Sequence, residues 1–235
     1  MAVAFTHDKG YVHGDLYLGN VLLQLTSRLN HLSDQQLYEE FGSPDPKLVT
    51  RADGKPLTSG VPSHVFSPAK PVLSDFGVAF SPVRESRSES YTPLQMRPPE
   101  ARFESNTPLS FASNIWSLGC AIWAILAQRS FLDSFLFSED DATGDQVVAL
   151  GPLPPEEFIA NGRPREDRVV WSWYQRFEDS IQQPRRESGI EALDEKERDA
   201  FSEMVRSMLL FKPRDRPNAR QILNSMDEML GDSRI

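Results

Sequence analysis

Three oxygen-bearing side chains stand in two short motifs that suit metal-assisted transfer of a phosphoryl group. The motif HGDLYLGN at residues 13–20 contains Asp15 and Asn20, and the motif SDFG at residues 74–77 contains Asp75. A carboxylate such as Asp15 can orient an attacking hydroxyl and accept its proton. A second carboxylate and an amide oxygen, from Asp75 and Asn20, are ligands that Mg²⁺ accepts.

Each of these two motifs alone also fits an ordinary structural role. Asp15 suits a turn beside a glycine, and Asp75 suits the end of the buried strand VLSD, because strings of three or four residues recur by chance. Further motifs in a fixed order favour the chemical interpretation. They are RPPEA at 97–101, ASNIWSLG at 112–119 and MLLFKPRDRP at 208–217.

In this order the motifs resemble those of protein kinases. Nearly the whole chain is similar to the C-terminal lobe of a fungal serine/arginine-protein-kinase-like Ser/Thr kinase. The segments that carry the similarity are YVHGDLYLGNVLLQL, FGSPDPKLVTRADGKPLTSGVPSHV, SDFGVAFSP, TPLQMRPPEARFE and RFEDSIQQPRRESG. The resemblance implies a mainly α, α+β kinase-like fold over residues 1–235, as a helical C-terminal lobe with a few short strands. We expect the N-terminal sheet lobe to be missing.

The resemblance also assigns segments and roles along the chain. It implies a catalytic loop at 13–20, an insert at 26–70, an activation segment at 75–101 and a helical subdomain at 107–230. The implied cofactors are ATP and Mg²⁺. The implied catalytic residues are Asp15, Asn20 and Asp75, the cofactor contacts are Asn20, Asp75, Phe76 and Gly77, and the metal ligands are Asn20 and Asp75.

Four further residues have implied structural roles: His13, Glu100, Asn114 and Arg216. Glu100 and Arg216 are expected to form a buried ion pair, and His13 to brace the catalytic loop as a core histidine. Gly77 is expected to give the backbone freedom beside Asp75, and Phe76 to pack underneath as a spacer.

Three positions depart from the family pattern. Gly14 stands where many kinases have an Arg that pairs with a phosphorylated activation segment, and Tyr17 stands where Ser/Thr kinases have a phosphate-contacting Lys. Asn114 replaces an Asp that accepts hydrogen bonds from the catalytic loop, so the negative charge is lost. We therefore expect weaker catalysis, without switching through an arginine at position 14.

The parts that grip ATP phosphates are absent from this sequence. No Gly-x-Gly occurs among the thirteen glycines, and none of the six lysines lies in a Val-Ala-x-Lys context. The expected function is ATP-dependent phosphorylation of protein Ser or Thr by a truncated lobe that is inactive alone.

Two alternatives remain open. One is a non-catalytic pseudokinase or interaction module. The other is a small-molecule phosphotransferase, because HGDLxxGN also resembles the loop of aminoglycoside and choline kinases; the motifs at 97–101, 112–119 and 208–217 disfavour it.

The composition of the chain limits which binding partners and which cellular compartment we expect. The net charge of −9 argues against direct nucleic-acid or anionic-membrane binding and is compatible with a basic, Arg/Ser-rich protein substrate. The single Cys120 cannot form an internal disulfide, and the N-terminus lacks the pattern of a signal peptide, so we expect a cytoplasmic or nuclear protein. Nothing in the sequence indicates the oligomeric state.

Periodicity and capping signals predict the individual elements. We expect strands at 21–25 and 71–74, and a last helix that Pro217 opens in its first turn, with Ala219, Ile222, Leu223 and Met226 as its buried stripe. A capping box of Ser33 with Gln36 predicts a helix that ends at Gly42. The other helices are expected at 2–9, 111–128, 145–151, 169–181 and 193–210.

Overall fold

The computed structural model describes residues 1–24, 31–43, 70–103, 107–127, 130–132, 146, 149–150 and 172–231. The chain divides into two compact units, one made of Met1–Asn20 and Leu73–Ile235, the other of Val21–Val72.

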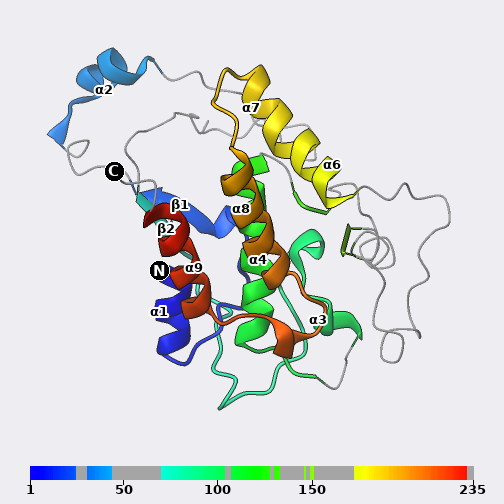
Figure 1. The fold of residues 1–235 in the computed structure, drawn as a ribbon. Helices are drawn as coiled ribbons and strands as arrows, with labels where there is room; N and C mark the ends of the chain where they lie inside the picture. Colours follow the sequence, from blue (N-terminus) through cyan, green and yellow to red (C-terminus); the bar gives the residue numbers. More distant parts are fainter. Residues whose placement is uncertain are drawn as a thin grey trace, which may run out of the picture. The chain divides into compact units, whose positions relative to one another are not determined.

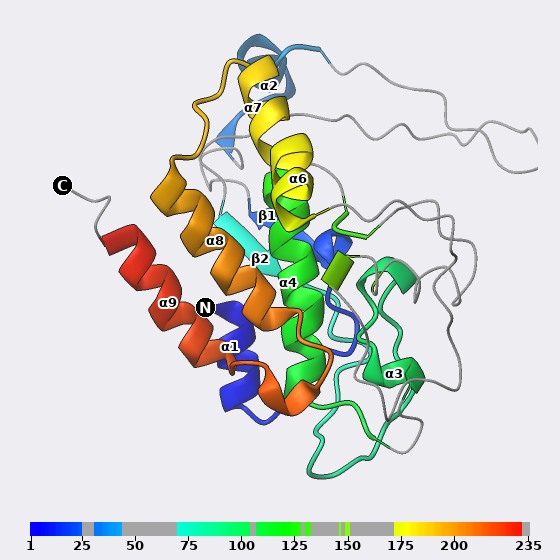
Figure 2. The ribbon, with the colours of Figure 1, turned by 45° about the vertical axis from the view of Figure 1, so that its right-hand side comes forward.

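Helix α4 (Phe111–Ala127) forms the centre of the first unit (Figures 1 and 2). Apolar residues cover nearly all of its faces, and Trp116, Cys120 and Trp123 are each at most 1% exposed. Burial raises the pKa of Cys120 to about 12, so its thiol stays protonated and acts as a packing group. The prediction of a buried helix over this segment is confirmed for the residues that the structure describes.

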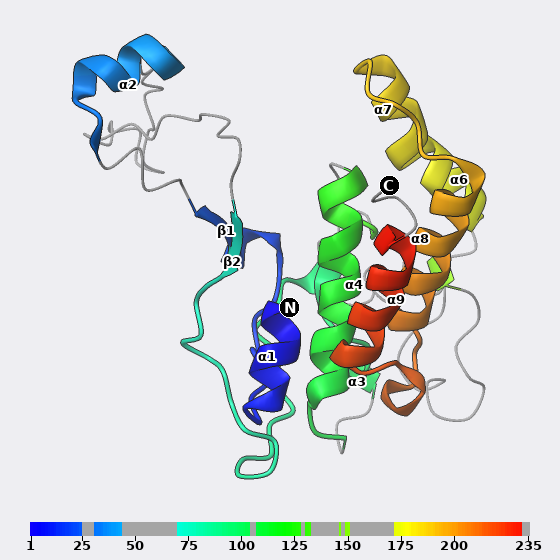
Figure 3. The ribbon, with the colours of Figure 1, turned by 60° about the vertical axis from the view of Figure 1, so that its left-hand side comes forward.

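Helix α8 (Glu195–Met208) packs along α4, with Phe201, Met204, Val205 and Met208 buried on one face. Gly119 permits this close approach, because a Cβ there would lie 3.1 Å from the Cβ of Met208. Helix α9 (Ala219–Gly231) packs against both α8 and α1 (Ala2–Asp8). Figure 2 shows α9 beside α1, and Figure 3 shows α9 beside α8. The N-terminal and C-terminal helices of the first unit are therefore in direct contact.

The start of α9 differs from the sequence prediction. The side chain of Asn218 accepts a hydrogen bond from the backbone N–H of Gln221 at 3.0 Å, and the Gln221 side chain accepts from the N–H of Asn218 at 2.8 Å. This reciprocal arrangement makes Asn218 the helix cap, so Pro217 precedes the helix and does not lie in its first turn. The predicted stripe is present: Ala219 and Ile222 are buried, and Leu223 and Met226 are half-buried against the core.

The helix expected at 169–181 is later and longer in the structure. It begins with α6 (Trp173–Phe177), capped by Ser172, passes through a π-helical turn, η4 (Glu178–Gln182), and ends with α7 (Gln183–Glu187). Part of the predicted segment, including Trp171, lies outside the described residues, as does most of the helix expected at 145–151. Phe177 and Ile181 anchor this element, with at most 1% exposure each.

The second unit contains the insert. Strands β1 (Val21–Gln24) and β2 (Lys70–Leu73) pair in a two-stranded sheet, and the last residue of β2 belongs to the first unit. Helix α2 (Asp34–Phe41) begins at Ser33, which forms the predicted capping box with Gln36, and ends at Gly42. The local sequence signals therefore predicted this helix correctly, whereas residues 25–30 and 44–69 lie outside the described part.

The secondary structure is mostly helical among the described residues, which agrees with the mainly α expectation at that level. The strands described are the short pair β1 and β2. Within the described residues, no helix combines the length and the apolar character that crossing a membrane requires.

Candidate functional site: a loop and a turn joined by hydrogen bonds

A short antiparallel bridge joins the loop at 13–20 to the turn at 74–80. The N–H of Val12 donates to the carbonyl of Phe80 at 2.8 Å, and the N–H of Phe80 donates back at 3.0 Å. Both side chains are buried with Leu109 in a small apolar cluster. The bridge fixes the point from which the loop and the turn extend.

His13 braces the loop from beneath. The ring is fully buried, and its Nε2 lies 2.8 Å from the carbonyl oxygen of Ser74. A carbonyl can only accept, so Nε2 carries the hydrogen and Nδ1 is free to accept from the backbone N–H of Asp15 at 3.4 Å. The same neutral ring therefore binds both segments, as the sequence predicted for a core histidine.

Asn20 holds Asp15 through one amide group. Its Nδ2 donates to the Asp15 carbonyl oxygen at 2.8 Å and to Oδ2 of the carboxylate at 3.2 Å. The amide oxygen of Asn20 takes no part in these two contacts. Oδ1 of Asp15 is buried and has no hydrogen-bond partner in the described part of the chain. One carboxylate oxygen of Asp15, Oδ2, therefore accepts a hydrogen bond, whereas Oδ1 has no donor among the described residues.

Ser74 connects Asn20 to Asp75. Its backbone N–H and its hydroxyl both donate to the Asn20 carbonyl, each at 2.9 Å. Asp75 follows directly, so the three residues implied by the sequence belong to one hydrogen-bonded region. Asp75 itself is exposed.

The backbone strain in this turn falls on Asp75, which corrects the expectation for Gly77. Asp75 has φ 58°, the one positive φ of a non-glycine residue in the described part, and such conformations cluster at functional sites. Gly77 contributes space, because a Cβ there would lie 3.3 Å from Oδ1 of Asp75. Glycine at 77 therefore leaves room for the carboxylate.

Phe76 also differs from its expected role as a buried spacer. Its side chain is 45% exposed, and its ring centroid lies 4.6 Å from that of His13. The ring thus covers the buried histidine on one side and faces solvent on the other.

The oxygen donors fit Mg²⁺ in kind. Asn20 offers an amide oxygen and Asp75 a carboxylate, and Mg²⁺ is usually held by one or two protein carboxylates together with phosphates and water. The described residues contain no group of three or more His, Cys, Asp or Glu arranged for a metal. A magnesium ion here would take its remaining ligands from phosphate and water.

The departure at position 14 has a local steric reason. Gly14 has φ 83°, and a Cβ on it would lie 2.6 Å from the carbonyl oxygen of Val78, so a larger residue does not fit this conformation. The ring of Tyr17 lies over Gly19, where a Cβ would come within 2.4 Å of Cε2. Both glycines therefore belong to the shape of this loop.

Asn114 does not make the contact that its position implied. It is 4% exposed, no hydrogen bond joins it to loop residues 13–20 in the described structure, and its Nδ2 has no partner there. A buried unsatisfied donor costs about 1–3 kcal/mol. Asn114 therefore provides no hydrogen bond that would hold the described loop at residues 13–20 in place.

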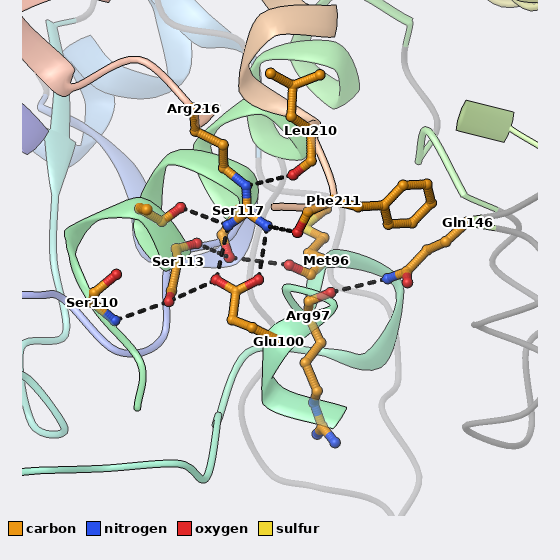
Figure 4. Close-up of polar contacts among 11 residues, drawn as sticks. Met96, Arg97, Glu100, Ser110, Ser113, Ser117, Gln146, Leu210, Phe211 and Arg216 are labelled. Atoms are coloured by element: carbon orange, nitrogen blue, oxygen red, sulfur yellow. Dashed lines mark hydrogen bonds and ion pairs between the residues drawn. The ribbon is translucent and has the colours of Figure 1, made fainter. Parts of the chain in front are cut away.

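Glu100 and Arg216 form the buried ion pair that the sequence resemblance implied. The guanidinium binds both carboxylate oxygens, at 2.8 and 2.7 Å, and both side chains are at most 1% exposed (Figure 4). The remaining N–H groups of Arg216 donate to the backbone carbonyls of Leu210, Ala112 and Phe211. The pair fixes the start of α3 (Glu100–Phe103) against the segment before α9.

Two serines of α4 complete this network. The hydroxyl of Ser113 donates to Oε1 of Glu100 at 2.9 Å, and the hydroxyl of Ser117 donates to the carbonyl of Met96 at 3.0 Å (Figure 4). Sequence reasoning missed both serines, as it missed Ser74. The sequence feature that could have indicated these serines is the presence of small polar residues inside otherwise apolar segments.

A scan against models of known protein families finds no match, and a search of curated proteins finds no match either.

Proposed function

We propose that this chain is the catalytic-loop lobe of an ATP-dependent Ser/Thr protein kinase, which transfers a phosphoryl group to a Ser or Thr hydroxyl of a protein. The observation that carries the proposal is the hydrogen-bonded unit of Asp15, Asn20 and Ser74, with the strained Asp75 next in the chain. Catalysis of this reaction consists mainly of positioning and charge stabilisation. A rigid set of oxygen groups on a braced loop suits that task.

Each residue has a distinct role in this proposal. Asp15 orients the acceptor hydroxyl and takes its proton, and such a hydroxyl is the kind of donor that its Oδ1 lacks. Asn20 and Asp75 would hold Mg²⁺, which neutralises phosphate charge when it is bound. Asn20 has a second role, because its Nδ2 keeps the Asp15 carboxylate in place.

A second candidate, a non-catalytic kinase-like module, is favoured by three observations. Tyr17 lacks the positive charge of the lysine that the family pattern places there, and Asn114 makes no hydrogen bond with described loop residues. The 235 residues also contain no Gly-x-Gly and no Val-Ala-x-Lys segment. Under either candidate we expect little or no phosphorylation by this chain alone.

The proposal includes the substrate and the compartment. The net charge of −9 suits a basic protein substrate, and an Arg/Ser-rich segment is the class we propose. The single buried Cys120 suits a reducing compartment, so we place the protein in the cytoplasm or the nucleus.

Binding of a fluorescent ATP analogue, with and without Mg²⁺, tests the proposal. We expect weak binding that requires Mg²⁺ and falls at least about tenfold in Asp75→Asn, because the variant lacks the ligand charge. Asp15→Asn should bind as the native chain does, since Asp15 acts on the hydroxyl. Asp179→Asn removes an exposed carboxylate on η4 and serves as the matched control.

Equal binding by the native chain and Asp75→Asn would contradict the assigned site. Strong, Asp15-dependent phosphorylation of a Ser/Thr peptide by the 235 residues alone would show that the chain needs no further phosphate-gripping parts.

A further inference from the structure

The side chain of Arg87 makes two contacts with the turn that contains Asp75. Its Nη1 donates to the carbonyl of Val78 at 2.7 Å, and its guanidinium lies over the ring of Phe80 with 4.7 Å to the centroid. The backbone carbonyl of Arg87 accepts from the N–H of Leu109 at 2.7 Å. The side chain is 22% exposed, so these contacts are partly shielded from water.

Two of the groups that Arg87 contacts, the Val78 carbonyl and the Phe80 ring, belong to residues that also touch the catalytic loop. The Val78 carbonyl lies against Gly14, with no room for a Cβ between them, and Phe80 forms the two-bond bridge to Val12. A shift of either group would move the loop that contains His13 and Asp15 relative to the turn that contains Asp75.

We propose that Arg87 is a positioning residue that fixes the Asp75 turn against the Asp15 loop through the Val78 carbonyl and the Phe80 ring. Its consequence for catalysis rests on the proposed function, but its geometric role does not, because that role can be measured without nucleotide. The sequence pattern alone gave no indication of this role.

Glu85 provides the competing explanation. The Nε and Nη2 atoms of Arg87 both donate to Oε1 of Glu85, at 3.0 and 2.7 Å, whereas Nη1 alone reaches Val78. If the ion pair with Glu85 were the important contact, removing the Glu85 charge would have the same effect as removing Arg87. Because Arg87 binds Val78 and Glu85 through different nitrogen atoms, substitutions can distinguish the two explanations.

Hydrogen exchange of the Val12 and Phe80 amides tests the proposal directly, because these amides form the bridge. In Arg87→Met we expect both amides to exchange at least about tenfold faster, in keeping with loss of a charge-assisted hydrogen bond. Amides inside α4, at Trp116 and Cys120, should change much less. Arg84→Met removes an exposed charge from the same segment and should leave all these rates unchanged.

Two more variants sharpen the test. Glu85→Gln should leave the bridge protected. Arg87→Lys should recover part of the protection, because one ammonium donor can still reach the Val78 carbonyl whereas the stacking of the planar guanidinium on Phe80 is lost. An equal increase of exchange in α4 and the bridge, an unfolded Arg87→Met chain, or a Glu85→Gln effect as large as that of Arg87→Met would each overturn the proposal. Absence of Mg²⁺-dependent nucleotide binding in the native chain would instead count against the proposed function and leave the exchange result standing.

Discussion

The polar network around Arg216 and the polar network around Asp15 are built in opposite ways. Around Arg216, five hydrogen bonds use every N–H of the guanidinium, and both oxygens of Glu100 are bonded. Around Asp15, one carboxylate oxygen has no partner in the described structure, and the neighbouring Asp75 is exposed with a strained backbone.

This difference separates a structural network from a candidate site. A network with all groups satisfied has nothing left to offer a ligand, so its contribution is to hold segments together. Unmet acceptors and backbone strain persist only where the surroundings enforce them, and such places are candidates for binding or chemistry. The Glu100 pair therefore has the features of a stabilising network, and the Asp15 region has the features that the proposed ligand-binding role requires.

The largest expected effect comes from breaking the closed network. Arg216→Met leaves the Glu100 carboxylate buried without a counter-charge, and we expect the free energy of unfolding to fall by about 3–5 kcal/mol. Urea denaturation measures the loss. The matched control is Arg220→Met, which removes an exposed arginine paired with Asp8 and should change stability little. Similar losses in both variants would contradict the special role of the buried pair.

A smaller loss of stability is expected from a substitution of Gly14, because the loop that contains Asp15 packs closely against the Val78 carbonyl at this residue. Gly14→Ala forces a Cβ into the Val78 carbonyl and adds a left-handed penalty of about 1–2 kcal/mol. Gly10→Ala is the control, because Gly10 has nearly the same φ, 81°, with nothing within 4 Å of its Cβ position. The excess loss in Gly14→Ala, measured by urea denaturation, reports the clash; equal losses would mean that the loop can move away freely.

The smallest effect, a pH-dependent loss of stability, is expected from His7. Nε2 of His7 is buried without a partner in the described structure, and burial lowers the pKa of His7 from its ordinary value of 6.5 to about 4. The unfolded chain therefore takes up the proton more readily. The stability associated with neutral His7 is complete above pH 6.5 and is lost as the pH falls towards 4.

The variant His7→Gln isolates this contribution from that of the carboxylates. Between pH 6.5 and 4, the native chain should lose more stability in urea than His7→Gln does. Parallel curves for the two proteins would show that His7 does not resist protonation in the fold.

Local signals predicted the elements well where one short segment contained all the information. Ser33 and Gln36 form a reciprocal cap within four residues, so the helix after them could be read directly from the sequence. Pro217 was misplaced because proline suits both the first turn and the residue before the cap, and the bonds between Asn218 and Gln221 decide between them. The π-helical turn after Phe177 has no sequence signature of this kind.

The candidate site was predictable in its residues and less so in its geometry. Asp15, Asn20 and Asp75 follow from residue type and order. The restriction on Gly14 and the contacts of Arg87 both depend on the Val78 carbonyl coming close in space. Such contacts between distant segments cannot be read from spacing along one chain.

The central claim, a metal site formed by Asn20 and Asp75, is tested most directly with Mn²⁺ as a paramagnetic probe of the native chain. The account predicts that Mn²⁺ broadens the amide NMR signals of residues 13–20 and 74–77 first, that Mg²⁺ reverses the broadening, and that Asp75→Asn abolishes it. Broadening centred on other acidic residues, or unchanged broadening in Asp75→Asn, would contradict the claim.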